Sequence, residues 1–142
     1  MPDILRATRW FNVPIIILLT VQGLSYLLSD EDKRFSSTSF TAAKHIAPMT
    51  TWGIMFLLGA ITIAFATYLD NQKILSNALF IGGAVYTWWA LLFAVSIFLE
   101  PETASLVGPA NSLFIAFTLF MGCWRIRVRL AAAEARRANQ TG

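Results

Sequence analysis

The stretch "ILSNALFIGGAVYTWWALLFAVSIFL", residues 74–99, decides the fold of this chain because it contains no Asp, Glu, Lys, Arg or His. The hydrocarbon core of a bilayer is about 30 Å thick and a helix rises about 1.5 Å per residue, so about 20 apolar residues cross it. The stretch exceeds that length. It therefore predicts a membrane-spanning helix.

Three further stretches, residues 10–29, 49–69 and 106–124, also lack those five residue types. Of the 142 residues, 56% are hydrophobic and only 13% are charged. Soluble domains carry about 25% charged residues, so this chain has too little polar surface to cover a water-soluble globule. The sequence predicts an all-α integral membrane protein, with a single domain over residues 1–142, in which four transmembrane helices precede a basic tail at 125–142.

The first apolar stretch follows Arg6 and Arg9, as the apolar part of a secretory signal peptide would. However, it is long enough to span a membrane, and the letters "YLLS" at its end lack a small-x-small cleavage site. We therefore interpret the stretch as a retained first helix.

Lysine and arginine are distributed unevenly between the two sides that four spans would create. Both termini and the loop between the second and third spans share one side. That side collects eight of the eleven cations, namely Arg6, Arg9, Lys73, Arg125, Arg127, Arg129, Arg136 and Arg137. Because cytoplasmic loops carry the excess of Lys and Arg, the sequence predicts that both termini are cytoplasmic.

The segment "GCWRIRVRL", residues 122–130, begins the basic tail and alternates Arg with apolar residues. Such alternation is typical of a strand, but a single strand has no sheet to join among helices. As a helix, the segment places Arg125, Arg127 and Arg129 around the end of the fourth span, where anionic lipid attracts each by about 1 kcal/mol. The net charge of +3 therefore indicates a lipid partner and no nucleic acid.

Small residues on the second and third spans are candidates for helix packing, because they let two backbones approach closely. The candidates are Gly53, Gly59, Ala60, Ala64, Gly82, Gly83 and Thr87. Such faces serve either packing within one chain or self-association between chains. The sequence leaves both alternatives open.

Amide side chains within the predicted spans include three candidates: Gln22 in the first, Asn77 in the third and Asn111 in the fourth. Polar side chains of this kind hydrogen-bond between membrane helices, with about 0.6 kcal/mol gained per bond on average. We interpret all three as packing or interface residues. Because no span carries a charged residue, the sequence argues against a proton- or ion-coupled transporter.

Trp10, Trp52 and Trp124 lie near predicted ends of spans, where an indole faces lipid while its N–H meets water. Trp88 and Trp89 instead fall in the middle of the third span. The favoured interpretation is that these two pack against other helices or acyl chains. The alternative is that they line a binding cavity.

The loop before the second span carries Phe35, Phe40, Ala43 and Ile46 at helical spacing. This pattern predicts a short amphipathic helix that lies on the membrane surface. Pro48 is expected to end it before the second span begins.

The sequence contains one His and one Cys, His45 and Cys123, which are too few for a Cys/His metal cluster. It also lacks a phosphate-binding glycine loop, a nucleophile elbow and a plausible pair of catalytic carboxylates. We therefore expect no enzymatic activity, no metal site and no cofactor.

The chain has an Arg-rich start, a span, an acidic and Ser-rich loop, the segment "PMTTWGIMFLLGA" at residues 48–60, two further spans and a basic tail. Over nearly its whole length this order resembles small four-span membrane proteins of actinobacterial phages, of the holin-like type encoded in lysis cassettes. The resemblance implies accumulation in the bacterial inner membrane, self-association, and timed permeabilisation of that membrane during host-cell lysis. It implies no catalytic residues.

Two other functions fit the same features. A non-enzymatic accessory or scaffolding subunit would use its small-residue faces to contact another membrane protein. A small-solute or quinone-binding membrane protein would use Trp88 and Trp89 to line its cavity. The holin-like function is the leading hypothesis.

Overall fold

The computed structural model describes residues 2–28, 40–99 and 106–141, with side chains described at 12–28, 40, 42–99 and 106–140. The helices in these ranges are α1 (Pro2–Leu28), α3 (Thr41–Ile46), α4 (Met49–Tyr68), α5 (Gln72–Leu99) and α6 (Val107–Thr141). The described residues contain no β-strand. The predicted all-helical fold is therefore confirmed.

Proline and turn-forming residues set the boundaries of α4 and α5. Pro48 directly precedes α4, and its carbonyl accepts a hydrogen bond from the Thr51 N–H at 3.0 Å. In the turn after α4, Asp70 adopts a positive φ of 53°, a conformation that Asp tolerates better than most residues. The Asn71 side chain then accepts a hydrogen bond from the Ile74 N–H at 3.1 Å and so caps the start of α5.

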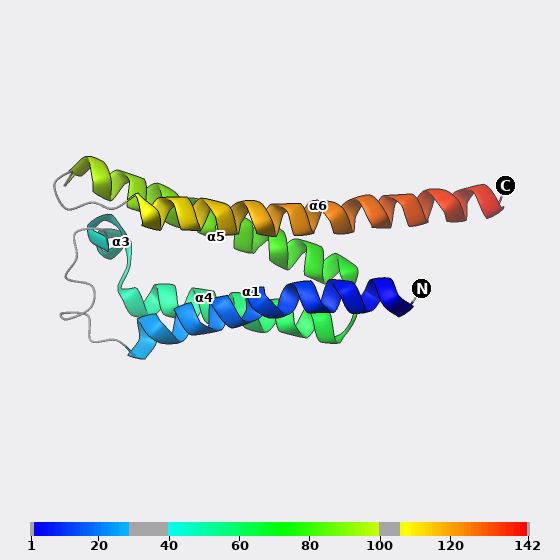
Figure 1. The fold of residues 1–142 in the computed structure, drawn as a ribbon, viewed down its shortest axis with the longest axis horizontal. Helices are drawn as coiled ribbons and strands as arrows, with labels where there is room; N and C mark the ends of the chain where they lie inside the picture. The colour runs from blue at the N-terminus through cyan, green and yellow to red at the C-terminus, as the bar shows by residue number, and fades with distance from the viewer. Residues whose placement is uncertain (1, 29–39, 100–105, 142) are drawn as a thin grey trace.

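The four long helices form two antiparallel hairpins (Figure 1). α1 packs along α4, and α5 packs along α6, whereas α4 and α5 contact each other less extensively. α3 lies at one end of the molecule, and both chain termini lie at the other end. We call these the α3 end and the terminal end, and we call the contact between the two hairpins the hairpin interface.

Glycine permits close approach within each hairpin. A Cβ atom built on Gly53 would lie 2.9 Å from the Gly23 carbonyl oxygen, and one on Gly23 would lie 2.7 Å from Leu57 Cγ. In the other hairpin, a Cβ atom on Gly83 would lie 2.8 Å from the Phe120 ring. Each hairpin is thus closed by contacts that leave no room for a larger residue without a shift.

Among the described residues, α4, α5 and α6 are each long and apolar enough to cross a membrane. The apolar part of α1 whose side chains are described, Asn12–Leu28, is shorter. α6 has 35 residues and extends at the terminal end beyond the other helices (Figure 1). It is continuous through "GCWRIRVRL", so the prediction of a helix for this segment, in preference to a strand, is confirmed.

Exposed and buried side chains are distributed as expected of a protein whose solvent is lipid. Large apolar side chains are exposed on every long helix, for example Val21, Ile61, Phe98 and Phe114. Four polar side chains of the described residues are buried, namely Asn12, Ser76, Ser96 and Ser112. Exposed apolar area on this scale marks a membrane or binding surface, and the three long apolar helices indicate the membrane.

The prediction for the loop helix was right in part. A helix does precede Pro48. Ala42 and Ala43 are buried and the helix packs against α5, whereas Lys44 and His45 are exposed; its position on a membrane surface stays a prediction. Ile46, expected on its apolar face, is exposed. Phe35 lies outside the described residues. The apolar pattern of the loop did not reveal that Ala42 would be buried and Ile46 exposed.

Candidate functional site at the hairpin interface

Aromatic rings fill the hairpin interface next to α3. Trp89 of α5 lies at the centre of this group, with its ring 4.7 Å from that of Trp52 and 5.7 Å from those of Tyr26 and Phe56, measured between centroids. The group brings together residues from α1, α4, α5 and the start of α3: Tyr26, Phe40, Trp52, Phe56, Tyr86, Trp89 and Phe93. Ring pairs at such separations add about 0.5–1.5 kcal/mol beyond the burial of their area.

A polar connection crosses the interface within this aromatic group. The Tyr86 hydroxyl on α5 donates a hydrogen bond to Gln22 Oε1 on α1 at 2.5 Å. Gln22 Nε2 in turn donates to the Tyr26 hydroxyl at 3.1 Å. The bond from Tyr86 therefore links one hairpin to the other, whereas the bond to Tyr26 stays within α1 and holds the Gln22 amide in place.

α3 connects the same two hairpins at the end of the molecule. The Trp52 indole N–H of α4 donates to the Ala43 carbonyl at 3.3 Å. The Ala42 backbone N–H donates to the Ser96 hydroxyl of α5 at 3.3 Å. Phe40 lies directly before α3 and places its ring 5.3 Å from that of Phe93 on α5. A helix of six residues thus bonds to both hairpins.

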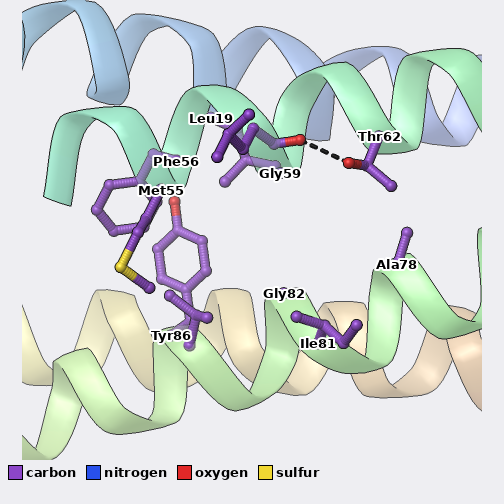
Figure 2. A pocket seen from close by; sticks show the side chains of 11 residues that line it. Leu19, Met55, Phe56, Gly59, Thr62, Ala78, Ile81, Gly82 and Tyr86 are labelled. Carbon is purple, nitrogen blue, oxygen red and sulfur yellow. Dashed lines mark hydrogen bonds between the residues drawn. The ribbon is translucent and has the colours of Figure 1, made fainter. Parts of the chain in front are cut away.

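Towards the terminal end, the hairpins are separated by a groove of about 230 Å³ (Figure 2). It is lined by Leu19 of α1, by Met55, Phe56, Leu58, Gly59 and Thr62 of α4, and by Ala78, Ile81, Gly82, Val85 and Tyr86 of α5. Its lining is almost entirely apolar, and the Thr62 hydroxyl donates to the Leu58 carbonyl of its own helix at 2.7 Å. Among the described residues, no buried side-chain polar atom lacks a partner.

The small residues predicted for helix packing divide into two groups. Gly53 and Gly83 lie where helices within a hairpin meet closely, and Ala60 is buried. Gly59 and Gly82 line the groove instead. Ala64 is half-buried, and the Thr87 hydroxyl bonds to the Gly83 carbonyl of its own helix at 2.9 Å.

The three predicted intramembrane amides occupy different surroundings. Gln22 accepts the hydrogen bond from Tyr86 across the interface and donates to Tyr26 of its own helix. Asn77 and Asn111 are both exposed on the helix surface. The structure therefore brings only Gln22 of the three into the interface.

The tryptophans do not follow the sequence-based interpretation uniformly. Trp52 was expected to face lipid, but it is 4% exposed and lies beneath α3. Trp89 is buried among aromatic rings, whereas Trp88 is half exposed on the outer face of α5. Neither Trp88 nor Trp89 lines the groove. Consecutive residues on a helix point about 100° apart, so these two could not share one environment.

The arginines at the end of α6 also differ from one another. Arg127 donates from Nε to the Ser76 hydroxyl at 3.2 Å, and its guanidinium carbon lies 5.4 Å from the centre of the Phe80 ring. It therefore contacts α5, although its side chain is exposed, as are those of Arg125 and Arg129. Arg6 and Arg9 lie on α1, and their side chains are outside the described set.

Sequence reasoning missed several residues of the interior. Asn12 is 1% exposed, and its Nδ2 donates to the Thr67 hydroxyl at 3.1 Å, which joins α1 to α4. Ser76 lies 3.4 Å from the sulfur of Cys123, and Ser96 binds α3. Tyr86, the donor to Gln22, has no distinguishing sequence context. These interior residues share one feature that the sequence shows: each is a polar residue in a largely apolar stretch of a membrane helix.

The described residues contain no group of three or more His, Cys, Asp or Glu side chains placed to hold a metal ion. His45 is exposed and Cys123 is buried. No family model, no curated protein and no solved structure matches this chain. The hairpins, their interface and the groove are therefore the features from which a function is inferred.

Proposed function

We propose that this chain is a holin-like protein of the bacterial inner membrane, which spans the membrane four times with both termini in the cytoplasm, self-associates, and permeabilises the membrane during phage lysis. The proposal includes α1 as the fourth span. α1 runs antiparallel to α4 as a helix of 27 residues, which at about 1.5 Å per residue exceeds the thickness of the hydrocarbon core.

The observation that carries the proposal is the division of the molecule into two closed hairpins with an incompletely packed interface. A permeabilising protein has to insert as a sealed unit and later rearrange. The apolar side chains on the outer faces can contact the acyl chains, so the protein can insert without making the membrane leak. The groove between the hairpins leaves an interface that rearranges at lower cost than the close Gly23–Gly53 packing within a hairpin.

Self-association has a physical basis in the buried polar side chains. In hydrocarbon, a polar side chain that loses its partner seeks another. If the hairpins separate, Gln22, Tyr86 and Ser96 lose bonds that cross the interface. Bonding to a second copy would restore them. Attraction of Arg125 and Arg129 to anionic lipid would hold the terminal end at the cytoplasmic surface.

The proposal is tested by inducible expression in a bacterial host with a potential-sensitive dye. The expected result is an abrupt loss of membrane potential and arrest of growth after a delay, followed by lysis when an endolysin is co-expressed. An unrelated multi-span protein expressed to the same level serves as the control. Harmless accumulation would contradict the proposal, and accumulation together with a co-purifying membrane protein would support the accessory-subunit alternative.

A further inference from the structure

The connections between the two hairpins are concentrated towards the α3 end. There, Tyr86 bonds to Gln22, and Ala42 bonds to Ser96. By contrast, two other buried polar contacts of the described residues lie within a hairpin. Asn12 bonds to Thr67 between α1 and α4, and the Ser76–Cys123 contact joins α5 to α6.

The opposite part of the interface is held differently. The groove occupies the space between α4 and α5 from Met55 and Tyr86 to Thr62 and Ala78 (Figure 2). Beyond it, the two hairpins are joined covalently by the short turn at 69–71, in which Asp70 has a positive φ. The interface is thus bonded at one end, open along its middle and linked by a turn at the other end.

We infer that α3 and the Gln22–Tyr86 bond form a releasable clasp, and that its release lets the hairpins part about the turn at 69–71. The clasp is defined by Gln22, Ala42, Ala43, Trp52, Tyr86 and Ser96. Its hydrogen bonds are of a kind that contributes little to stability within membranes, because alternative partners are available there. An equilibrium between closed and parted hairpins therefore responds to the loss of one or two of them.

The consequence is a built-in control of association. Closed, the clasp satisfies Gln22, Tyr86 and Ser96 inside one molecule. When the hairpins part, the Tyr86 hydroxyl and the Gln22 Oε1 atom lose each other, and the Ala42 N–H loses the Ser96 hydroxyl, unless a second copy of this chain pairs with them. The Ser96 hydroxyl keeps its bond to the Leu92 carbonyl of its own helix at 3.0 Å. Only the effect of opening on lysis rests on the proposed function. The opening itself is a property of the isolated molecule.

Opening is measured as the distance between nitroxide labels placed on the two hairpins in lipid nanodiscs. Ile54 of α4 and Leu91 of α5 are exposed, do not line the groove and suit replacement by labelled cysteine, in a Cys123→Ser background. An excess of unlabelled protein is added so that pairs of labels on different molecules do not contribute to the measured distances. We expect a single short distance for the parent protein, and a longer, broader distribution for Tyr86→Phe combined with Ser96→Ala.

Matched controls separate the clasp from general effects of the substitutions. Tyr68→Phe removes the hydroxyl of an exposed tyrosine, and Ser112→Ala removes a serine whose hydroxyl bonds to the Gly108 carbonyl of its own helix. Both should leave the distance unchanged. Gln22→Leu removes the same bond as Tyr86→Phe from the other side, so the double variant should open no further than either single variant.

The same variants are then induced in a bacterial host. If the clasp also times lysis, the delay before depolarisation should shorten by about twofold or more, because a small change in free energy shifts the open population several-fold. An unchanged distance in folded clasp variants would overturn the clasp, whatever happens to the cells. A longer distance without depolarisation by any variant would support the clasp and overturn the proposed function.

Discussion

At the scale of single residues, the presence or absence of a side chain at a few positions controls how closely helices approach. Gly53 lies against the Gly23 carbonyl, so a methyl group there would meet backbone that cannot rotate away. Gly59 lies six residues further along α4 and borders the groove, where the nearest atom to an added Cβ is Leu19 Cδ1 at 3.9 Å. Two glycines in one apolar helix thus have different roles.

The first prediction compares these two glycines. Gly53→Ala should destabilise the protein by about 1–3 kcal/mol, because α1 and α4 must move apart. Gly59→Ala should be neutral or stabilising by up to about 1 kcal/mol, because alanine favours the helix and meets open space. Reversible unfolding in mixed micelles measures both. Equal losses of stability for the two variants would contradict the close approach at Gly53.

At the scale of elements, α3 shows how a helix of six residues acquires a fixed position. Such a helix is too short to be stable alone, so its tertiary contacts must hold it. Those contacts are the Trp52 indole bond to the Ala43 carbonyl and the Ser96 bond to the Ala42 N–H. The burial of Ala42 and Ala43 adds to these contacts.

A second prediction concerns this anchoring of α3. Trp52→Phe should cost about 1–3 kcal/mol, because it removes a buried hydrogen bond and part of a buried ring. Trp88→Phe provides the control: Trp88 is half exposed on α5, and a surface substitution of this kind changes stability by about 0.5 kcal/mol or less. Reversible unfolding in mixed micelles measures the stability of both variants. An unaltered Trp52→Phe protein would show that the indole bond does not anchor α3.

At the scale of the whole molecule, the arrangement places both termini at one end. Four crossings would give this result in a membrane, whereas three crossings would separate the termini across the bilayer. In the proposed four-span topology, the arginines at the terminal end, including Arg125 and Arg129, would place that end in the cytoplasm.

Topology reporters test this arrangement directly. A fluorescent protein that folds only in the cytoplasm should be active when fused after residue 142 or inserted at the turn at 69–71. A phosphatase that is active only outside should respond when fused after residue 103, between α5 and α6. An N-terminal fusion should behave like the C-terminal one. Opposite locations for the two termini would reduce the number of spans to three.

The sequence alone determined the helical class and most helix boundaries. Long runs without charge require backbone hydrogen bonds to be made within the segment, so helices follow from residue type alone. For this reason the predicted stretches at 49–69 and 74–99 nearly coincide with α4 and α5. Pro48 also marked the start of α4, because proline ends the preceding helix by its own covalent structure.

Only the tertiary structure decided which residues meet. In lipid-facing helices, apolar side chains occur on both the inner and the outer face, so the pattern that separates them in soluble proteins is lost. The sequence therefore did not reveal that Trp52 and Trp89 point inward while Trp88 points outward. It likewise singled out Gln22 but not its partner Tyr86, because a hydrogen bond between residues 64 positions apart depends on how the two hairpins pack.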